Sequence, residues 1–459
     1  MSVDLDERHP LAQVLTLRGW TGESYLRRVA ERHQALGYGT LAARKEKISR
    51  WTRSHQPQTP SLHTRLAMAD VLGVDAREVL TRPWPHWLML ALQDETTIWE
   101  SPWTPAGIIH ALDHAGGPPV DLDRRGFLIT TTATLTATLA HWSTATPAPA
   151  RTTGGRRISA TVAEHIERRL AHLRHLDDAL GSDHVYDSAR AETQLVRRLL
   201  TDRTYSAATG QRLHACAAEA SRLAGWCAYD QGRTGAAEEH FATALRAAAG
   251  AGDPTSAAIA LAFWANLRYT QPTPDPLGAL DLIDGALTHR TTITSPRVLT
   301  LLHLRRARAH SIARDPAAAY RAIDDALTAY VHGTPPEHDV PSLYWITAGE
   351  VLQAAGSAAL TLNDPHRALV YFQAAATHPD PYDPHKEPRG TAIYLTRTAT
   401  AHLSRGDVDG AVETARRALD LMAGVGSARG NDSLSVLRTQ LSRHRSAPVV
   451  RDFLAETEQ

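Results

Sequence analysis

Lysine is almost absent from this sequence. Only three of the 459 residues are lysines, and two of them, Lys45 and Lys47, lie in the segment 44–53. That segment holds five cations and one acid, whereas the whole chain has 49 basic and 49 acidic residues and no formal net charge. A chain without excess charge has no general attraction to nucleic acid, so any such attraction must be local. The segment 44–53 is therefore the first candidate for a functional surface.

Cysteines and long apolar runs are also scarce. The two cysteines, Cys216 and Cys227, are too few for a disulfide-stapled secreted scaffold. An intervening helix would separate them by roughly 16 Å, which no disulfide spans. The acidic N-terminus lacks the apolar core of a signal peptide. These features predict a protein of the reducing cytoplasm.

One apolar run, 127–140, follows a pair of arginines and resembles part of a twin-arginine export signal. It lies far from the N-terminus, where such signals act. It also carries six threonines and is shorter than the roughly 20 residues of a membrane-spanning helix. We expect a docked helix or a linker and no membrane partner; the alternative is an export signal or a membrane-attached sensor.

The common motifs of enzymes and cofactor sites are missing as well. The sequence has no Walker loop, no Gly-x-Gly-x-x-Gly after a strand, no Gly-x-Ser-x-Gly and no paired zinc hairpins. His165, His172 and His175 share a predicted helix with Glu164 at spacings that suit a metal. However, 24 histidines are scattered through the chain, which favours a solvated helix face. We expect no enzymatic activity, no catalytic residues, no metal and no cofactor.

The first 82 residues predict a small domain of short helices. In the helix expected at 41–53, Ile48 and Trp51 are three residues apart, so they share a buried face and leave the cations on the other faces. A short helix with an apolar face and cationic flanks fits a DNA major groove. Thr21 is a suitable N-cap for the helix expected at 21–36. The helices are expected at 10–18, 21–36, 41–53, 61–72 and 75–80.

The run Ile48-Ser49-Arg50-Trp51 resembles the end of the recognition helix in the bacteriophage-repressor-like (Xre-type) helix-turn-helix family. Thr52 and Ser54 stand where that family has Glu and Gly. The resemblance implies that helices 21–36 and 41–53 form the helix-turn-helix. The alternative is a solvated basic helix on a protein-interaction domain. By family position, Lys45, Glu46, Ser49 and Arg50 face base edges, while Arg44, Lys47 and Arg53 contact phosphate.

Residues 83–158 predict a connector between two domains. Trp84, Trp87, Trp99 and Trp103 lie among prolines, and amphipathic aromatics in such a segment usually pin it onto a neighbouring element. Residues 143–158 are rich in Pro, Thr and Gly, which is typical of a linker.

From residue 159 to residue 459 the sequence predicts helices that repeat. Ala237, Phe241 and Ala244 form a triplet that returns in register at intervals of 42, 40, 49 and 43 residues. Small residues beside one large apolar residue let two helices pack closely, and each pair then stacks on the next. The pattern predicts an all-α protein with an α-solenoid. Its cores are expected near 215–248, 257–289, 299–331, 346–377 and 391–422, with closing helices at 432–457.

The repeat unit resembles the tetratricopeptide repeat, whose spacing is matched by Gly225 and Gly232 with the first triplet, and by Ala399, Gly406, Ala411 and Ala418 in the last copy. The resemblance implies a concave surface lined by the first helix of each pair. Arginine and aromatic side chains there suit a peptide with an acidic group or C-terminus. The alternative is that the tryptophans are inter-repeat core and the arginines are solvated. The register places on or near this surface Arg222, Trp226, Trp264, Arg268 and Arg308.

The whole chain resembles actinobacterial regulators that join an Xre-type domain to tetratricopeptide repeats. The resemblance implies a DNA-binding transcriptional regulator of development or secondary metabolism, associated with the nucleoid. We expect double-stranded DNA as a partner and a homodimer, with a peptide, small molecule or protein shifting the population of repeat arrangements. The alternative is a scaffold or adaptor that does not bind DNA. The resemblance is carried by Gly37–Trp51, Trp84–Trp87, Arg124–Leu128 and Val450–Leu454.

Overall fold

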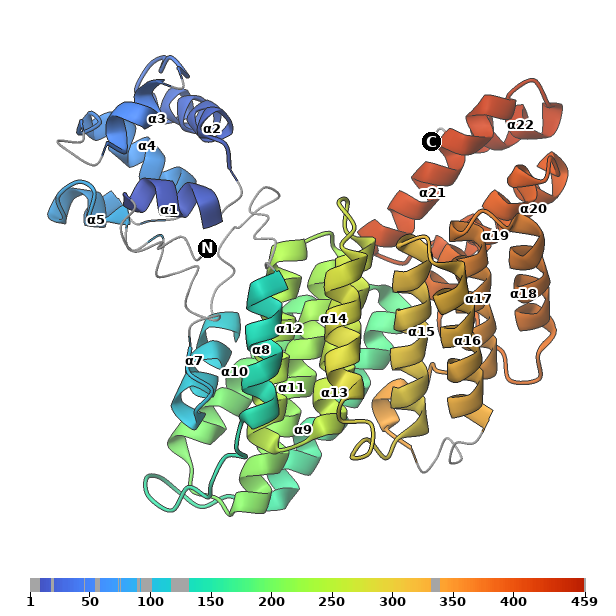
Figure 1. The fold of residues 1–459 in the computed structure, drawn as a ribbon, viewed down its shortest axis with the longest axis horizontal. Coiled ribbons are helices and arrows are strands. Elements are labelled where there is room, and N and C mark those ends of the chain that lie inside the picture. Colours follow the sequence, from blue (N-terminus) through green and yellow to red (C-terminus); the bar gives the residue numbers. More distant parts are fainter. Residues whose placement is uncertain are drawn as a thin grey trace. The chain divides into compact units, whose positions relative to one another are not determined.

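The computed structural model describes residues 9–17, 20–44, 46–53, 58–72, 74, 76–88, 91, 101–116, 132–331 and 339–457. Over these ranges the regular secondary structure is helical, and the only β pairings are isolated bridges (Figure 1). The chain divides into two compact units. Unit 1 contains Met1–Ser101 and Pro118–Thr134, and unit 2 contains Pro102–Gly117 and Leu135–Gln459.

Unit 1 contains five described helices around one apolar core. The side chain of Thr21 accepts a hydrogen bond from Ser24 N (3.1 Å), which confirms the predicted N-cap. Ile48 packs against the core and Trp51 is buried in it, so their predicted shared face is confirmed. The helices are α1 (Pro10–Leu17), α2 (Gly22–Ala35), α3 (Glu46–Trp51), α4 (Leu62–Leu72) and α5 (Ala76–Thr81).

Helix α3 is shorter than the expected 41–53, since residues 41–44 are not helical and the helix spans Glu46–Trp51. Gly37 and Gly39 have φ of 78° and 84°, a left-handed conformation that a helix does not contain. His33 Nδ1 lies 2.8 Å from the Gly39 carbonyl, and the Tyr38 ring stacks on His63 at 4.5 Å. The chain is therefore non-helical at residues 37–40, between α2 and α3.

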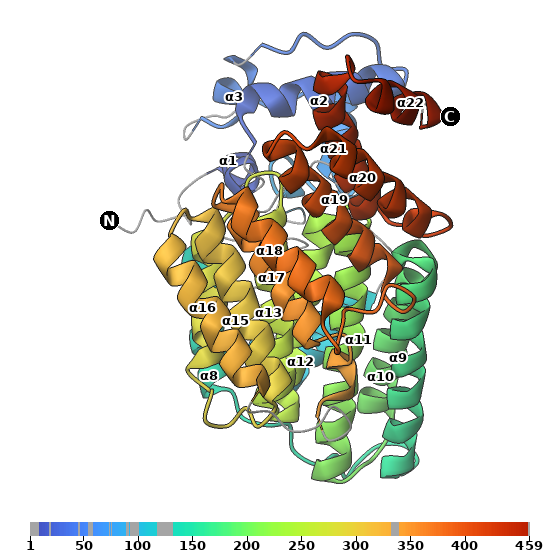
Figure 2. The same cartoon turned by 90° about the vertical axis from the view of Figure 1, so that its right-hand side faces the viewer.

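Unit 2 is a consecutive array of helices, which confirms the predicted all-helical, solenoid-like arrangement (Figures 1 and 2). Paired helices pack in the order α11 with α12, α13 with α14, α15 with α16, α17 with α18 and α19 with α20. The described helices that contribute to it are α7 (Pro105–Gly116), α8 (Thr132–Thr144), α9 (Ala160–Leu180), α10 (Tyr186–Asp202), α11 (Ala207–Asp230), α12 (Thr234–Ala251), α13 (Pro254–Thr270), α14 (Pro276–Leu287), α15 (Pro296–Ile312), α16 (Pro316–Val331), α17 (Ala348–Thr361), α18 (Pro365–Thr377), α19 (Pro388–Ser404), α20 (Val408–Met422), α21 (Ala428–Leu441) and α22 (Pro448–Glu456), with short 3-10 turns η1 (Ser182–His184) and η3 (Pro341–Leu343).

All five predicted triplets are buried on the second helix of each pair, so the repeat register is correct. A Cβ at Gly225 of α11 would lie 2.7 Å from the Phe241 ring of α12. Gly356 of α17 stands in the same relation to Phe372 of α18, at 2.6 Å. The glycines are therefore required by the close approach of the paired helices. The triplets are Ala237/Phe241/Ala244, Ala279/Ile283/Ala286, Ala319/Ile323/Ala326, Ala368/Phe372/Ala375 and Ala411/Ala415/Ala418.

The turns within four of the helix pairs share one backbone feature, a residue in the left-handed conformation. Gly232, Arg314, Asn363 and Gly406 all have positive φ, between 63° and 80°, and each is followed by the residue that precedes the second helix. In the last of these turns, Asp407 Oδ1 accepts a hydrogen bond from Gly410 N (2.9 Å). A left-handed residue ends the first helix, and an N-cap starts the next.

Most of the segment predicted as a linker, 143–158, connects α8 to α9, and it is docked on unit 2. Ala148 N donates to the Gly250 carbonyl (2.8 Å), and Arg151 exchanges backbone hydrogen bonds with Tyr205 (2.9 and 3.1 Å). Backbone groups paired in this way cannot belong to a free linker. Within α8, the Trp142 ring lies 4.3 Å from the His289 ring.

The tryptophans of the predicted connector fall in different units. Trp87 is completely buried in the core of unit 1, and Trp84 packs against the same core. Trp103 belongs to unit 2, where Arg246 Cζ lies 4.5 Å from its ring, and Trp99 lies outside the described residues. The part of the apolar run 127–140 that is described forms α8, where Leu139 packs against Gly285. Among the described helices, none has both the length and the apolar character needed to cross a bilayer.

Candidate ligand cavity and basic segment

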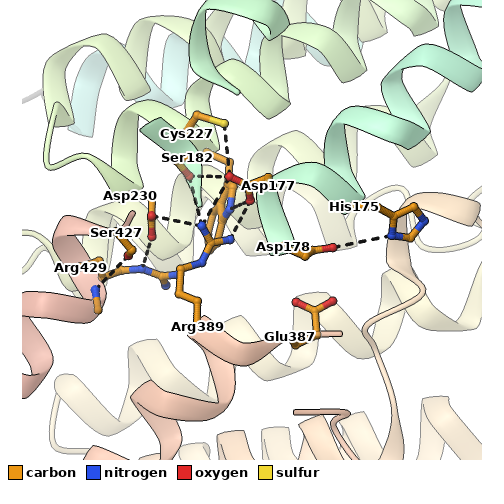
Figure 3. A network of polar contacts seen from close by, with 12 residues as sticks. His175, Asp177, Asp178, Ser182, Cys227, Asp230, Glu387, Arg389, Ser427 and Arg429 are labelled. Atoms are coloured by element: carbon orange, nitrogen blue, oxygen red, sulfur yellow. Dashed lines mark hydrogen bonds and ion pairs between the residues drawn. The ribbon is translucent and has the colours of Figure 1, made fainter. Parts of the chain in front are cut away.

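Ion pairs join the beginning of the helical array to its end (Figure 3). Arg389 of α19 donates to Asp177 of α9 (2.7 Å) and to Asp230 of α11 (3.1 Å). Arg429 of α21 donates to the other oxygen of Asp230 (3.1 Å). Asp177, Asp230 and Arg389 have exposed fractions of 2%, 0% and 5%, so these charges are desolvated and depend on one another. We call these four residues the closure cluster.

Neighbouring contacts reinforce the closure cluster. Trp226 Nε1–H donates to Asp177 Oδ2 (3.1 Å), and Arg429 Cζ lies 4.5 Å from the Trp226 ring. Burial opposes ionisation of Asp177, but the Arg389 guanidinium outweighs it and lowers the pKa of that carboxyl. The adjacent Asp178 accepts a hydrogen bond from the Tyr344 hydroxyl, and burial raises its pKa. The two consecutive aspartates have opposite pKa shifts because Asp177 is bonded to the Arg389 guanidinium, whereas Asp178 is bonded to a neutral hydroxyl.

Unit 2 contains an open cavity of about 480 Å³ beside the closure cluster. Its wall comes from the first helix of each pair, α11, α13, α15, α17 and α19, together with α9, α21 and the η3 region. This volume lies within the roughly 300–1,000 Å³ typical of small-molecule sites. Its aromatic lining residues are Trp226, Tyr229, Phe263, Tyr269, Tyr344, Trp345, Tyr382 and Tyr394.

Seven arginines and five acidic residues of the described chain line the cavity, and the arginines fall into two groups. Four of them bind carboxylates. Arg174 and Arg222 both donate to Glu219 Oε1 (2.9 and 2.8 Å), and Arg389 and Arg429 belong to the closure cluster. Burial opposes ionisation of Glu219, but Arg222 and Arg174 lower its pKa to about 2. The second group, Arg305, Arg308 and Arg397, forms no ion pair with any described residue.

The structure divides the five residues predicted for the concave surface. Arg222, Trp226 and Arg308 line the cavity. Trp264 and Arg268 do not: they are 0% and 1% exposed, and both donate to Glu238 Oε1, at 3.1 and 2.9 Å. Their placement on the surface is therefore wrong, because a carboxylate on the adjacent helix α12 holds them in the interior.

Sequence reasoning missed two of the arginines in the second group, Arg305 and Arg397. Each stands 18 residues before the central residue of its triplet, Ile323 and Ala415 respectively, so they occupy equivalent register positions. Arg305 also precedes Arg308 by one helical turn and shares its face. The register places both residues at the same position of their repeats, although it does not by itself show which residues at that position face the cavity.

The basic segment of unit 1 presents most of its predicted DNA-contacting residues to solvent. Lys47 is half-buried, and burial, followed by the charges of Arg50 and Arg44, lowers its pKa. Arg50 Nε lies 3.4 Å from the Glu46 carbonyl. Lys45 lies outside the described residues. The exposed residues are Arg44, Glu46, Ser49, Arg50 and Arg53.

No protein-family model matches the chain, and no curated protein is significantly similar to it. Within the described ranges, no three His, Cys, Asp or Glu side chains are grouped closely enough to hold a metal ion. His165, from the predicted histidine-rich helix, instead accepts from Arg168 Nη2 (2.8 Å). Both cysteines are buried thiols, and burial raises the pKa of Cys216 to about 12.

Proposed function

We propose that the protein is a DNA-binding transcriptional regulator whose repeat unit binds a ligand. The observation that carries the proposal is the exposure of three cations of segment 44–53, Arg44, Arg50 and Arg53, on and beside a helix, α3, that is anchored by Trp51. Because the whole chain has no net charge, this concentration of exposed cations is a local feature. Local positive potential at a helix is the electrostatic signature of a nucleic-acid interface.

In this proposal, α2 and α3 act as an Xre-type helix-turn-helix. Arg50 and Ser49 contact base edges, and Arg44 and Arg53 contact phosphates. A helix of six residues reads few base pairs, so a homodimer bound to two half-sites supplies the remaining selectivity. The proposed location is the cytoplasm, at the nucleoid.

The repeats are proposed to be of the tetratricopeptide type, with the cavity as the ligand site. The close approach of Gly225 to Phe241 and the buried triplets support this assignment. A ligand that binds one arrangement of the repeats better than another shifts the population toward it. The ligand-bound arrangement would then alter how two copies bind DNA, with development or secondary metabolism as the proposed processes.

The proposal is tested by measuring binding to genomic DNA fragments over a range of salt concentrations. We expect Arg53→Ala to weaken binding to all sequences and to reduce the salt slope by about 1, because one phosphate contact is lost. Arg50→Ala should lose sequence discrimination of about 1–3 kcal/mol. The matched control is Arg417→Ala, which removes an exposed arginine from α20. If the double variant of Arg50 and Arg53 binds as tightly as the wild type, α3 is not the DNA-contacting helix.

A second candidate is a scaffold that binds proteins and not DNA. The observation that favours it is the shortness of α3, which begins at Glu46 after a loop where a longer recognition helix was expected. In that case duplex DNA binds weakly, and the Arg50 and Arg53 variants behave like Arg417→Ala. A steep salt dependence that these two variants reduce favours the regulator.

A further inference from the structure

Three arginines lie close together in the cavity wall with only neutral partners. Arg308 Nη1 donates to the Ser357 carbonyl (2.7 Å), and Arg397 Nη1 donates to the Ser357 hydroxyl (2.9 Å). One residue of α17 therefore holds guanidinium groups from α15 and α19. Arg305 lies one turn from Arg308 on α15, and its Nη1 is 3.4 Å from the Tyr269 hydroxyl. We call Arg305, Arg308 and Arg397 the open arginine cluster.

None of the three guanidinium groups has an ion-paired carboxylate among the described residues, and their compensation is unequal. Burial lowers the pKa of Arg305, but Tyr269 and Glu350 outweigh it and raise that pKa. Burial, then the charge of Arg397, lowers the pKa of Arg308 to about 10, and Arg305 adds to this effect. Glu350 is the cavity carboxyl whose charge acts on Arg305 and Arg397, but its Oε1 is bonded to the Tyr394 hydroxyl (2.7 Å). Burial raises the pKa of Glu350 to about 7. At neutral pH this carboxyl is therefore only partly ionised, and its negative charge offsets only part of the positive charge of the cluster. An anion placed among the three guanidinium groups would relieve their mutual repulsion.

Hydrogen-bond donors without acceptors lie in the same wall. Asn266 is 6% exposed, and its Oδ1 accepts from the Tyr269 hydroxyl (2.7 Å), whereas its Nδ2 has no acceptor among the described residues. Arg305 Nε likewise has no acceptor among the described residues. Buried donors are normally paired, so donors that converge on a cavity indicate a ligand rich in acceptor atoms.

Aromatic rings flank the open arginine cluster. Arg305 Cζ lies 5.9 Å from the centre of the Trp345 ring and 6.0 Å from that of Phe263. Arg397 Cζ lies 5.3 Å from the centre of the Tyr394 ring. Rings at these positions provide a flat apolar surface next to the cations. A ligand that fits both features carries a charged group on a planar apolar body.

We propose that the open arginine cluster binds a compact aromatic anion, a carboxylate or a phosphate monoester on a ring. The guanidinium groups would bind the charged group, and Phe263, Trp345 and Tyr394 would contact the ring. The closure cluster joins the two ends of the array, which favours a compact ligand over a long extended one. This inference specifies the class of ligand that the cavity binds, and it rests on the proposed ligand-binding role of the repeat unit.

The test measures binding of simple probes to the full chain by calorimetry, with phenyl phosphate, benzoate, inorganic phosphate and the neutral benzamide. We expect phenyl phosphate and benzoate to bind, inorganic phosphate to bind more weakly and benzamide not to bind. Arg305→Gln and Arg397→Gln should each weaken phenyl phosphate binding about tenfold or more, because a charge-assisted hydrogen bond is lost. Arg397→Lys should retain part of the affinity, and the control Arg417→Gln should retain all of it.

Several results would overturn the inference. These are equal binding of benzoate and benzamide, no binding of any anion to the folded wild type, or unchanged affinity in Arg305→Gln and Arg397→Gln. Melting curves of the free variants establish that they are folded, so a loss of binding cannot be attributed to unfolding.

The same charged group occurs on small acids and at the C-terminus of a peptide. Tripeptides that end in phenylalanine, with a free or an amidated C-terminus, separate these sources. Binding of the free form that exceeds that of benzoate and is lost in Arg397→Gln supports the cluster and assigns a peptide ligand. DNA binding is measured without any anion, so failure of the anion site and failure of the DNA-binding proposal are distinguishable.

Discussion

The closure cluster predicts a large and pH-dependent effect of replacing Arg389. Arg389→Met removes the guanidinium that donates to Asp177, Asp230 and the Ser182 hydroxyl (3.2 Å). Asp230 keeps Arg429, but Asp177 keeps only neutral donors, Trp226 among them. Breaking a buried ion pair from one side typically costs about 3–5 kcal/mol, since a charge stays buried without its partner. We expect a loss of this size at pH 7.

The pH dependence follows from the direction of the pKa shift of Asp177. In the wild type the pKa lies below its ordinary value of 3.8, so the ionised form contributes stability above that pH, which is lost as the pH falls. In Arg389→Met, burial is no longer opposed by Arg389, so the pKa of Asp177 rises and its ionisation disfavours the fold. The cost of the substitution should therefore be smaller at pH 4 than at pH 7.

Hydrogen exchange read by mass spectrometry is the suitable assay, because it reports on individual helices of the full chain. At pH 7, amides of α9 and α19 should exchange two to three orders of magnitude faster in Arg389→Met, which corresponds to about 3–4 kcal/mol. Exchange in α2 and α4 of unit 1 is the internal control. Asp177→Asn combined with Arg389→Met should recover part of the protection, since both charges are then absent. Unchanged protection of α9 and α19 would refute the assignment of these ion pairs as the closure.

Two further predictions concern the repeat core and a cavity carboxyl. Gly225→Ala should cost about 1–3 kcal/mol in urea unfolding, because its Cβ would lie 2.7 Å from the Phe241 ring, and Phe241→Leu in the same chain should recover part of the loss. Equal costs with and without Phe241→Leu would contradict this contact. Glu350 has its pKa raised from 4.5 to about 7 by burial, so the wild type loses stability as the pH rises through that interval. Glu350→Gln should therefore gain stability over the wild type between pH 4.5 and 7, by up to about 3 kcal/mol, and the difference should stay constant above that. A difference that does not change with pH would show that the Glu350 carboxyl titrates normally.

The candidate sites were predictable only where their residues follow the repeat register. Arg268 and Arg308 both stand 15 residues before the central residue of their triplets, so sequence spacing treats them alike. In the structure, Glu238 and Asp275 bind Arg268 in the interior, whereas Arg308 faces the cavity with neutral partners. The difference depends on acidic residues of other elements, which spacing along one helix does not specify.

The sequence by itself determined the helices, their pairing and the buried triplets. Apolar periodicity, N-caps such as Thr21 and small residues such as Gly225 act within one or two turns, so they are visible in the order of residues. Only the tertiary structure decided that Asp177 meets Arg389, 212 residues away, and that residues 143–158 are docked. Contacts of this kind depend on the accumulated rotation of many stacked pairs. A small change per repeat moves the two ends far apart, so no local pattern of residues encodes their meeting.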